Sequence, residues 1–327
     1  MIFYTNWFET GIYTCTIYCT CMSVDVVWFK RDLRTRDHVP LLSASLSGRP
    51  VICLYILETE RLEQKDTDPI HIQWELDCAA DLSRTLNDSG AFLHYGLGDA
   101  TEVLEAIHLE HGIERLLSHE ETGNTWSYSR DISVSNFCKT KGIKWIEYPN
   151  NGVVRRLGNR DGWKRERDKR MRDPLSSPPM FKECSPFDGS VPALDDIGFT
   201  SRELLYRPRP GERAAIDRLD SFLERDSKEY RWAISSPVLS VKHGSGLSPY
   251  FSSGSLSMRR AVQKTNSRID WIRKNKSQVE DHGEWIKSLS SFRRRLAWRC
   301  HFIQKMEMKS DLDTVAQNPI IDRNMSR

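Results

Sequence analysis

Two segments in the C-terminal half combine residue types that suit ligand binding. The first, residues 244–259, reads GSGLSPYFSSGSLSMR and predicts a small-residue loop leading into a helix that begins near Met258, with Ser257 as its N-cap. Backbone N–H groups of Ser and Gly can approach an anion closely, and a helix N-terminus adds a favourable field. Taken alone, such a loop is more often an ordinary capped turn.

The second segment, residues 285–307, has the periodicity of an amphipathic helix. Its core stripe, at spacings of three and four, consists of Leu289, Phe292, Leu296, Cys300 and Ile303. A different face, offset by roughly a quarter to a third of a turn, carries Arg295, Trp298, Arg299 and Phe302. A large aromatic ring beside two guanidinium groups suits a planar or phosphorylated ligand. The alternative is a tryptophan that packs against a second helix.

The N-terminal half predicts the sheet that would support such a site. Short β-branched runs alternate with amphipathic stretches, as in a βαβ series, and occupy residues 25–29, 51–57, 91–95, 113–117 and 143–148. The predicted helical stripes contain Ile72, Leu76, Ala79 and Leu86, and further on Val103 and Ile107. We therefore expect an α/β fold whose five-stranded parallel, Rossmann-like sheet has helices on both faces, with any ligand beyond the carboxyl ends of the strands.

The composition indicates two domains joined by a long connection. A length of 327 residues with 39% hydrophobic and 28% charged residues is typical of a globular protein. We assign residues 22–150 to the α/β domain, the Pro-, Arg- and Ser-rich residues 151–210 to a linker, and residues 211–327 to a helical domain. Lys30 to Arg34 follow the first strand without a GxGxxG motif, which disfavours a nicotinamide-dependent dehydrogenase.

Residues 1–21 match neither a secretory signal nor a membrane span, and we assign them no function, with Met22 as the expected natural start. Cys15, Cys19 and Cys21 lie close together but lack the partners of a zinc site, so we expect no metal. The remaining cysteines are scattered singly, which favours a reducing compartment and a cytoplasmic location.

Basic residues are concentrated in the C-terminal half, although the net charge is only +3. Residues 155–172 contain nine Lys/Arg against three Asp/Glu, residues 259–276 contain seven against one, and residues 293–305 contain five basic residues and no acid. These clusters are compatible with a polyanion such as nucleic acid. Solvated helix faces and a flexible linker are the alternative explanation.

The motifs taken together resemble the DNA photolyase/cryptochrome family. The similarity lies in Leu-Ser-Pro-Tyr-x-x-x-Gly-x-Leu-Ser from Leu247, followed by Arg-Leu-x-Trp-Arg-x-His-Phe from Arg295. VVWFKRDLR from Val26, with Asp37, resembles the family's first strand and loop, and residues 163–179 resemble the linker of one branch. The match runs from Met22 to the end of the chain.

The resemblance implies an FAD cofactor in the helical domain, which absorbs light and donates an electron to a pyrimidine dimer in damaged DNA. The residues implied to bind the cofactor are Tyr230, Ser245, Gly246, Leu247, Ser248, Arg295 and Arg299. Trp298 is implied to stack against the lesion, with Arg295 beside it. We expect a monomer with no membrane partner.

The sequence departs from the family pattern at three places. Gly246 replaces an arginine that contacts phosphate, and Arg295 replaces a frequent carboxylate. The family's segments that complete the flavin site, including its catalytic residues, would follow Arg327, so we expect an incomplete FAD site that does not retain stoichiometric FAD. For the same reason we expect the stripe of Leu289, Phe292, Leu296 and Ile303 to be partly exposed.

The resemblance also implies a second, light-harvesting chromophore on the sheet domain, whose identity stays open. Residues 120–131 occupy the antenna region, where Trp126 and Ser127 replace the Asn-Glu of folate-binding members. Glu120 and Glu121 are alternatively no more than a solvated loop. Three functions remain open: a light-dependent DNA-repair lyase, a cryptochrome-type photoreceptor, and an inactive truncated member or stand-alone antenna-binding protein.

Overall fold

The computed structural model describes residues 23–181, 192–200, 207–318 and 320–321. The predicted extension of residues 1–21, with its three clustered cysteines, lies outside the described residues. Four further cysteines, Cys53, Cys78, Cys138 and Cys300, are buried. Among the described residues, no helix combines the length and the apolar character needed to cross a membrane.

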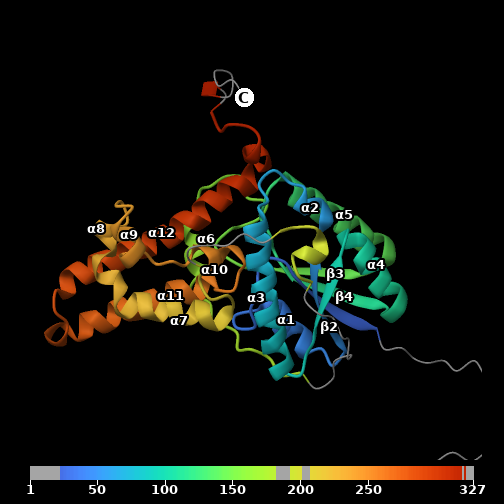
Figure 1. Ribbon diagram of the computed structural model, residues 1–327, viewed down its shortest axis with the longest axis horizontal. Helices are drawn as coiled ribbons and strands as arrows, with labels where there is room; N and C mark the ends of the chain where they lie inside the picture. Colours follow the sequence, from blue (N-terminus) through green and yellow to red (C-terminus); the bar gives the residue numbers. More distant parts are fainter. Residues whose placement is uncertain (1–22, 182–191, 201–206, 319, 322–327) are drawn as a thin grey trace, which may run out of the picture.

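A five-stranded parallel sheet forms the N-terminal half of the molecule (Figure 1). The strands are β1 (Val24–Phe29), β2 (Val51–Leu57), β3 (Leu93–Leu97), β4 (Ile113–His119) and β5 (Lys144–Tyr148). Their order is β3-β2-β1-β4-β5, so the direction in which the sheet grows reverses between β1 and β4. The predicted fold class is confirmed, because each strand overlaps one of the five predicted runs.

Helices cover both faces of this sheet. The helices of this half are α1 (Val39–Ser45), α2 (Thr59–Leu62), α3 (Pro69–Asp88), α4 (Ala100–His111) and α5 (Thr125–Lys141). Successive side chains of a strand point to opposite faces, and in β1 Val27 and Phe29 pack in the core under α1 and α3, whereas Val26 and Trp28 pack in the core under α4 and α5. The predicted stripe of α3 is fully buried.

The connection between the halves is partly structured. It contains α6 (Trp163–Arg170) and the 3-10 turn η1 (Asp195–Ile197). The Trp163 indole is buried and donates a hydrogen bond to the carbonyl of Gly152 (2.9 Å). Gln304 accepts a hydrogen bond from the backbone N–H of Val154 (2.7 Å) and donates one to its carbonyl (2.9 Å). The start of the linker is therefore fastened to the C-terminal helix.

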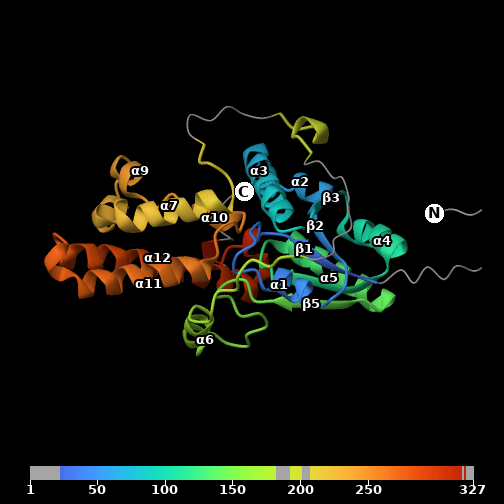
Figure 2. The ribbon, with the colours of Figure 1, turned by 90° about the horizontal axis from the view of Figure 1, so that it is seen from below.

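The C-terminal half is helical among the residues described. Its elements are α7 (Glu212–Glu224), η2 (Asp226–Glu229), α8 (Tyr230–Ala233), α9 (Leu239–His243), α10 (Ser248–Ser252), α11 (Met258–Lys274), η3 (Lys276–Gln278), α12 (His282–Met308) and η4 (Ser310–Asp313). The two longest, α11 and α12, lie side by side, and α7 packs beside them (Figure 2). Ser257 caps α11 by accepting a hydrogen bond from the N–H of Arg260, as predicted.

The core stripe of α12 corrects one expectation. Leu289, Phe292 and Leu296 are 0%, 3% and 3% exposed, and only Ile303 is half-buried. Partial exposure of this stripe is therefore wrong for three of the four residues. The physical reason is that α11, η2 and α8 pack against α12 and cover that face.

The sheet and the helical half share one hydrophobic core. Residues of β1 and α3 belong to the same packed cluster as Leu219 of α7 and Leu289 of α12. Gly254 marks the closest approach: its φ is +70°, and a Cβ there would lie 2.0 Å from the carbonyl oxygen of Arg31. Only glycine fits this contact. The domain boundaries at residues 150 and 210 stay a prediction.

Candidate functional site

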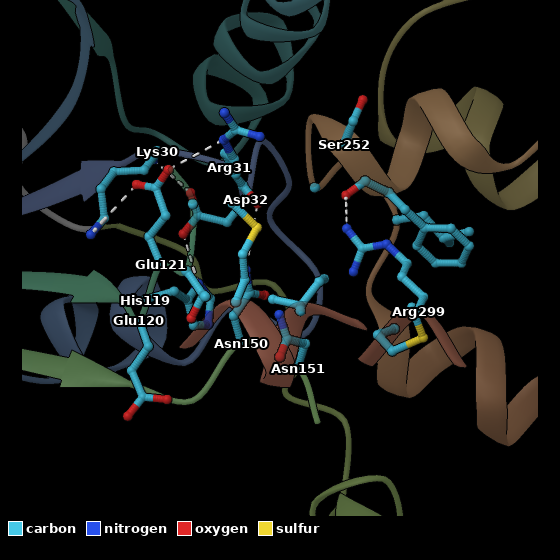
Figure 3. A pocket seen from close by; sticks show the side chains of 18 of the residues that line it. Lys30, Arg31, Asp32, His119, Glu120, Glu121, Asn150, Asn151, Ser252 and Arg299 are labelled. Atoms are coloured by element: carbon cyan, nitrogen blue, oxygen red, sulfur yellow. Dashed lines mark hydrogen bonds and ion pairs between the residues drawn. The ribbon is translucent and has the colours of Figure 1, made fainter. Parts of the chain in front are cut away.

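A cleft of about 270 Å³ lies between the carboxyl edge of the sheet and the helical half (Figure 3). Its sheet side is formed by the loop after β1 and the end of β4, where the strand order reverses, and its other side by α10 and Arg299 of α12. Ligands of open α/β sheets bind at such a reversal, so the predicted position beyond the strands is the position of this cleft.

The loop after β1 joins the two halves of the molecule. Leu33 N–H donates to the carbonyl of Ser253 (3.1 Å), and Arg34 donates to the carbonyl of Gly254 (2.9 Å). Glu212, at the start of α7, accepts hydrogen bonds from the N–H and hydroxyl of Thr35, both at 3.0 Å. These buried bonds hold one wall of the cleft at a fixed position relative to α10.

Asp32, His38 and His119 form a buried hydrogen-bonded unit beside the cleft. One oxygen of Asp32, Oδ2, lies 3.0 Å from His38 Nε2 and 2.7 Å from His119 Nδ1, while Oδ1 accepts the N–H of Lys30 at 2.8 Å. Burial alone would raise the pKa of Asp32, but the two imidazoles hold it well below its ordinary value. Burial lowers the pKa of both histidines, that of His119 to about 3.

The hydrogen bonds assign the tautomer of each ring and argue against a metal at this cluster. His38 Nδ1 accepts the backbone N–H of Leu41 (3.1 Å), so its proton lies on Nε2 and points at Asp32. A neutral imidazole that ligates a metal through Nε2 would need its proton on Nδ1. The unit is therefore an ionised aspartate that accepts a hydrogen bond from each of two neutral histidines.

A network of buried charges extends from this loop along the sheet edge. Arg130 of α5 binds Glu121 (2.6 Å), Asp131 (2.9 Å) and Glu58, and Lys30 approaches Asp131 at 3.4 Å. Burial opposes ionisation of Glu121, but Arg130 and Lys30 lower its pKa to about 2. The alternative of a solvated loop is therefore wrong for Glu121, which two cations draw into the protein.

Glu58 differs from Glu121 although both contact Arg130. Burial raises the pKa of Glu58 to about 7, and the neighbouring Glu121 adds to this effect against the attraction of Arg130. The cations of the network also lie over aromatic rings, Lys30 at 4.9 Å and Arg130 at 4.8 Å from the ring centre of Trp28. Two carboxyl groups that share the cation of Arg130 therefore have pKa values shifted in opposite directions.

Two further cavities adjoin the cleft, and one of them is lined by residues of the segment 120–131. One, of about 280 Å³, is lined by Trp74 and Trp126, and the other, of about 360 Å³, includes Trp74 and Ser248. Ser127 does not face a ligand: its backbone N–H and hydroxyl both bond to Asn124, which caps α5. Of the two substituted antenna positions, Trp126 alone lines a cavity.

The predicted phosphate loop is formed by residues 244–248. Gly246 has a φ of +64°, and Leu247 is completely buried. Among the described residues, the backbone N–H groups of Ser245, Gly246 and Ser248 make no hydrogen bond within the protein. Arg218 of α7 donates to the carbonyls of Ser245 (2.7 Å) and Gly244 (2.8 Å), so a guanidinium stands beside Gly246.

The other predicted site residues do not form a single pocket. Tyr230 is 4% exposed and packs edge-on against Phe222 and Phe292, with ring centres 5.4 and 5.6 Å apart. Arg295 is exposed and lies 4.7 Å from the ring centre of Trp298, which is 52% exposed. The predicted separation of this face from the core stripe is confirmed.

Arg299 is separated from Arg295 although both belong to α12. It faces the interdomain cleft, donates to the carbonyl of Phe251 (2.9 Å) and lies 5.5 Å from that ring (Figure 3). No carboxylate pairs with it among the described residues, and burial lowers its pKa. The geometry therefore links Arg299 with the cleft rather than with Trp298.

Sequence reasoning missed His38, His119 and Arg130. His38 is the N-cap of α1, His119 ends β4 and Arg130 lies in α5. His119 contacts Asp32 across 87 positions of sequence, and Arg130 contacts Glu58 across 72. No local spacing connects them. The only available signal was the position of His119 at the carboxyl end of a predicted strand, where ligand-binding residues gather.

Comparisons with known proteins agree with this architecture. The family model for DNA photolyase matches residues 25–158. A deoxyribodipyrimidine photo-lyase from Synechococcus is 23% identical over 83% of this chain and 58% of its own length, and cryptochrome DASH from Gloeobacter violaceus is 26% identical over 72% and 51%. Cryptochrome-1 from Erithacus rubecula is 25% identical over 91% of this chain and 51% of its own. The chain thus spans about half the length of these relatives.

Solved structures show the same fold. A bacterial class III photolyase from Agrobacterium tumefaciens has a TM-score of 0.74 at 20% identity, covering 94% of this chain and 63% of that protein. An archaeal photolyase from Sulfolobus tokodaii, solved with two FAD molecules, has a TM-score of 0.64 at 19% identity over 92% and 63%. Residues 25–158 thus match the DNA photolyase family model, and the chain is similar to DNA photolyases and cryptochromes in sequence and in fold.

Proposed function

We propose that this chain is a photolyase that uses a flavin cofactor to repair DNA in the light. The observation that carries the proposal is the Arg295–Trp298 pair on α12, an indole ring that is half exposed and has a guanidinium 4.7 Å from its centre. An exposed tryptophan beside a cation suits stacking against a base that has left the duplex.

The surroundings of this pair suit a polyanion. Arg293 and Arg294 are exposed one turn before Trp298, and Lys305 lies 5.7 Å from the ring centre of the exposed Phe302. Cations of this kind contact phosphates and release counterions without reading sequence. Damaged DNA is therefore the partner that fits the exposed face of α12.

The loop of residues 244–248 fits one end of FAD. The backbone N–H groups of Ser245, Gly246 and Ser248 bond to none of the described residues, so they can donate to an anion such as a diphosphate. Gly246 places no side chain in front of them, and Arg218 adds a positive charge nearby. A role of Tyr230 and Leu247 in contacting the cofactor remains a prediction, since both are buried by protein side chains.

When bound, FAD would supply the light-driven electron. The residues of this chain would do three things: the loop would bind the diphosphate, Trp298 would stack on the lesion, and Arg295 would hold a negative phosphate beside it. None of these tasks requires a proton transfer by the protein. Orientation is the contribution expected of these side chains.

We further propose that the interdomain cleft binds a second chromophore. The support is its place at the strand reversal, the adjoining cavity lined by Trp74 and Trp126, and the guanidinium of Arg299, which pairs with no carboxylate in the part of the chain that the structure describes. Planar chromophores bind in clefts that offer aromatic surface and a few polar groups.

The experiment is a repair assay with FAD added in excess, because the incomplete site is expected not to retain the cofactor stoichiometrically. Protein is mixed with an oligonucleotide that carries one thymine dimer, illuminated with blue light, and the loss of dimer is followed, with a dark sample as control. Light-dependent loss of the dimer is the expected result. Binding of the lesion with no splitting in the light would contradict the proposal and favour the photoreceptor alternative.

A further inference from the structure

His119 presents an unused hydrogen-bond acceptor to the interdomain cleft. The ring is 3% exposed and lines the cleft, and Nδ1 is committed to Asp32 at 2.7 Å. Among the described residues, Nε2 makes no hydrogen bond. A ligand that fills the cleft would cover Nε2, and an acceptor that is buried without a partner is costly, so such a ligand gains by offering it a donor.

The environment of His119 keeps this acceptor in place. Asp32 carries the negative charge, and its three protein donors hold the carboxylate still. His38 packs edge-on against His119 with ring centres 4.5 Å apart, and Arg34 lies nearby as a further positive charge. Both neighbours oppose a second proton on His119, so Nε2 stays a lone-pair acceptor at neutral pH.

The opposite side of the cleft offers donors. Arg299 uses one N–H for the carbonyl of Phe251 and pairs with no carboxylate among the residues described. A guanidinium in this situation suits an anionic group. The cleft therefore combines an acceptor on the sheet side with a cationic donor on the helical side.

We propose that His119 is the specificity-determining residue of the cleft: its Nε2 accepts a hydrogen bond from a ring N–H of a planar ligand whose anionic group binds Arg299. Asp32 is the positioning residue, because it fixes the proton of His119 on Nδ1. This inference rests on the proposed second-chromophore site and names the class of ligand, an anionic heterocycle with an N–H donor.

The tautomer is tested first, by long-range ¹H–¹⁵N NMR of the imidazoles at pH 7. The expected signature for His119 is a protonated Nδ1 and a bare Nε2. In Asp32→Asn the proton should redistribute between the two nitrogens, a change that a purely structural role of Asp32 would not produce. A wild-type His119 protonated on Nε2, or on both nitrogens, would overturn the inference.

The ligand class is tested with flavin mononucleotide, which has one ring N–H and a phosphate, and with its N3-methyl derivative, which lacks that N–H. We expect the methyl derivative to bind the wild type about tenfold or more weakly, as for loss of a hydrogen bond that leaves a buried acceptor unpaired. His119→Leu should bind the two flavins with equal affinity, about tenfold more weakly than the wild type binds flavin mononucleotide. His119→Gln should restore part of the affinity for flavin mononucleotide.

The outcomes separate this inference from the proposed function. Equal affinity of both flavins for the wild type, or no binding of flavin mononucleotide, would overturn the role of His119, while light-driven dimer repair would still support the proposed function. Conversely, discrimination between the flavins without any repair in the light would support His119 and contradict the proposed function.

Discussion

The carboxyl edge of the sheet and the exposed face of α12 are both rich in cations and aromatic rings, yet they differ in how the charges are paired. At the sheet edge, Arg130 is buried and contacts three carboxylates while lying over Trp28. On α12, Arg295 is exposed and contacts a tryptophan, and no ion pair is formed by it among the described residues. The charges at the sheet edge are therefore paired with one another inside the protein.

Paired and unpaired guanidinium groups contribute differently to stability and to ligand binding. A buried guanidinium is stable only because its carboxylates compensate its lost hydration, so removing it leaves carboxylates unpaired in the interior. An exposed guanidinium keeps its hydration and contributes little to stability. It remains available to a phosphate, which the partnered guanidinium of Arg130 is not.

The largest expected effect comes from deleting the charge at the sheet edge. Arg130→Met should destabilise the protein by about 3–5 kcal/mol, because Glu58, Glu121 and Asp131 lose their shared cation. The matched variant Arg295→Met should change the free energy of unfolding by less than about 0.5 kcal/mol. Urea denaturation of both variants provides the comparison, and similar losses in the two would remove the distinction.

A smaller effect is expected from the pH dependence of Glu58. Its pKa of about 7 exceeds the ordinary value of 4.5, so the folded state binds the proton more tightly than the unfolded state. The stability due to this group is present below about pH 4.5 and is lost as the pH rises towards 7. Glu58→Gln, which mimics the protonated form, should therefore exceed the wild type in stability by about 1–3 kcal/mol at pH 8 and match it near pH 4.5.

The control for this measurement is Glu60→Gln. Glu60 is exposed on α2 two residues away, and its replacement should leave the pH dependence of unfolding unchanged. Denaturation at several pH values between 4.5 and 8 checks both variants. A Glu58→Gln curve parallel to that of the wild type would show that Glu58 ionises normally in the folded protein.

Regular elements were predictable because each is encoded by a local period. The five runs of β-branched residues gave the five strands, and spacing of three and four on α12 separated Leu289 and Phe292 from Trp298. The expected exposure of that stripe was wrong since the packing of α11 and η2 on α12 is a tertiary contact. The carboxyl-edge position of a ligand cleft followed from the topology of the sheet.

The side-chain chemistry of the cleft was not predictable in the same way. Asp32 meets His119 across 87 positions, and Thr35 meets Glu212 across 177. Such pairs depend on strand order and on the docking of the helical half, which no local pattern encodes. Arg295 and Arg299 were equally hard to separate from the sequence, although they lie only one helical turn apart. Arg295 faces the solvent, whereas Arg299 faces the cleft.

The exposed face of α12 is expected to contact damaged DNA, and a tryptophan on α11 provides the control. Trp271 is 44% exposed and has Arg268 4.5 Å from its ring centre, so α11 also carries an accessible indole beside a guanidinium, although Arg268 lies over Trp285 as well. The decisive measurement is the ratio of affinities for a duplex with and without one thymine dimer, in the dark. We expect Trp298→Ala to lower this ratio about tenfold, as for the loss of one stacked base, and Trp271→Ala to leave it unchanged. An equal effect of the two substitutions, or none of Trp298→Ala, would contradict the claim.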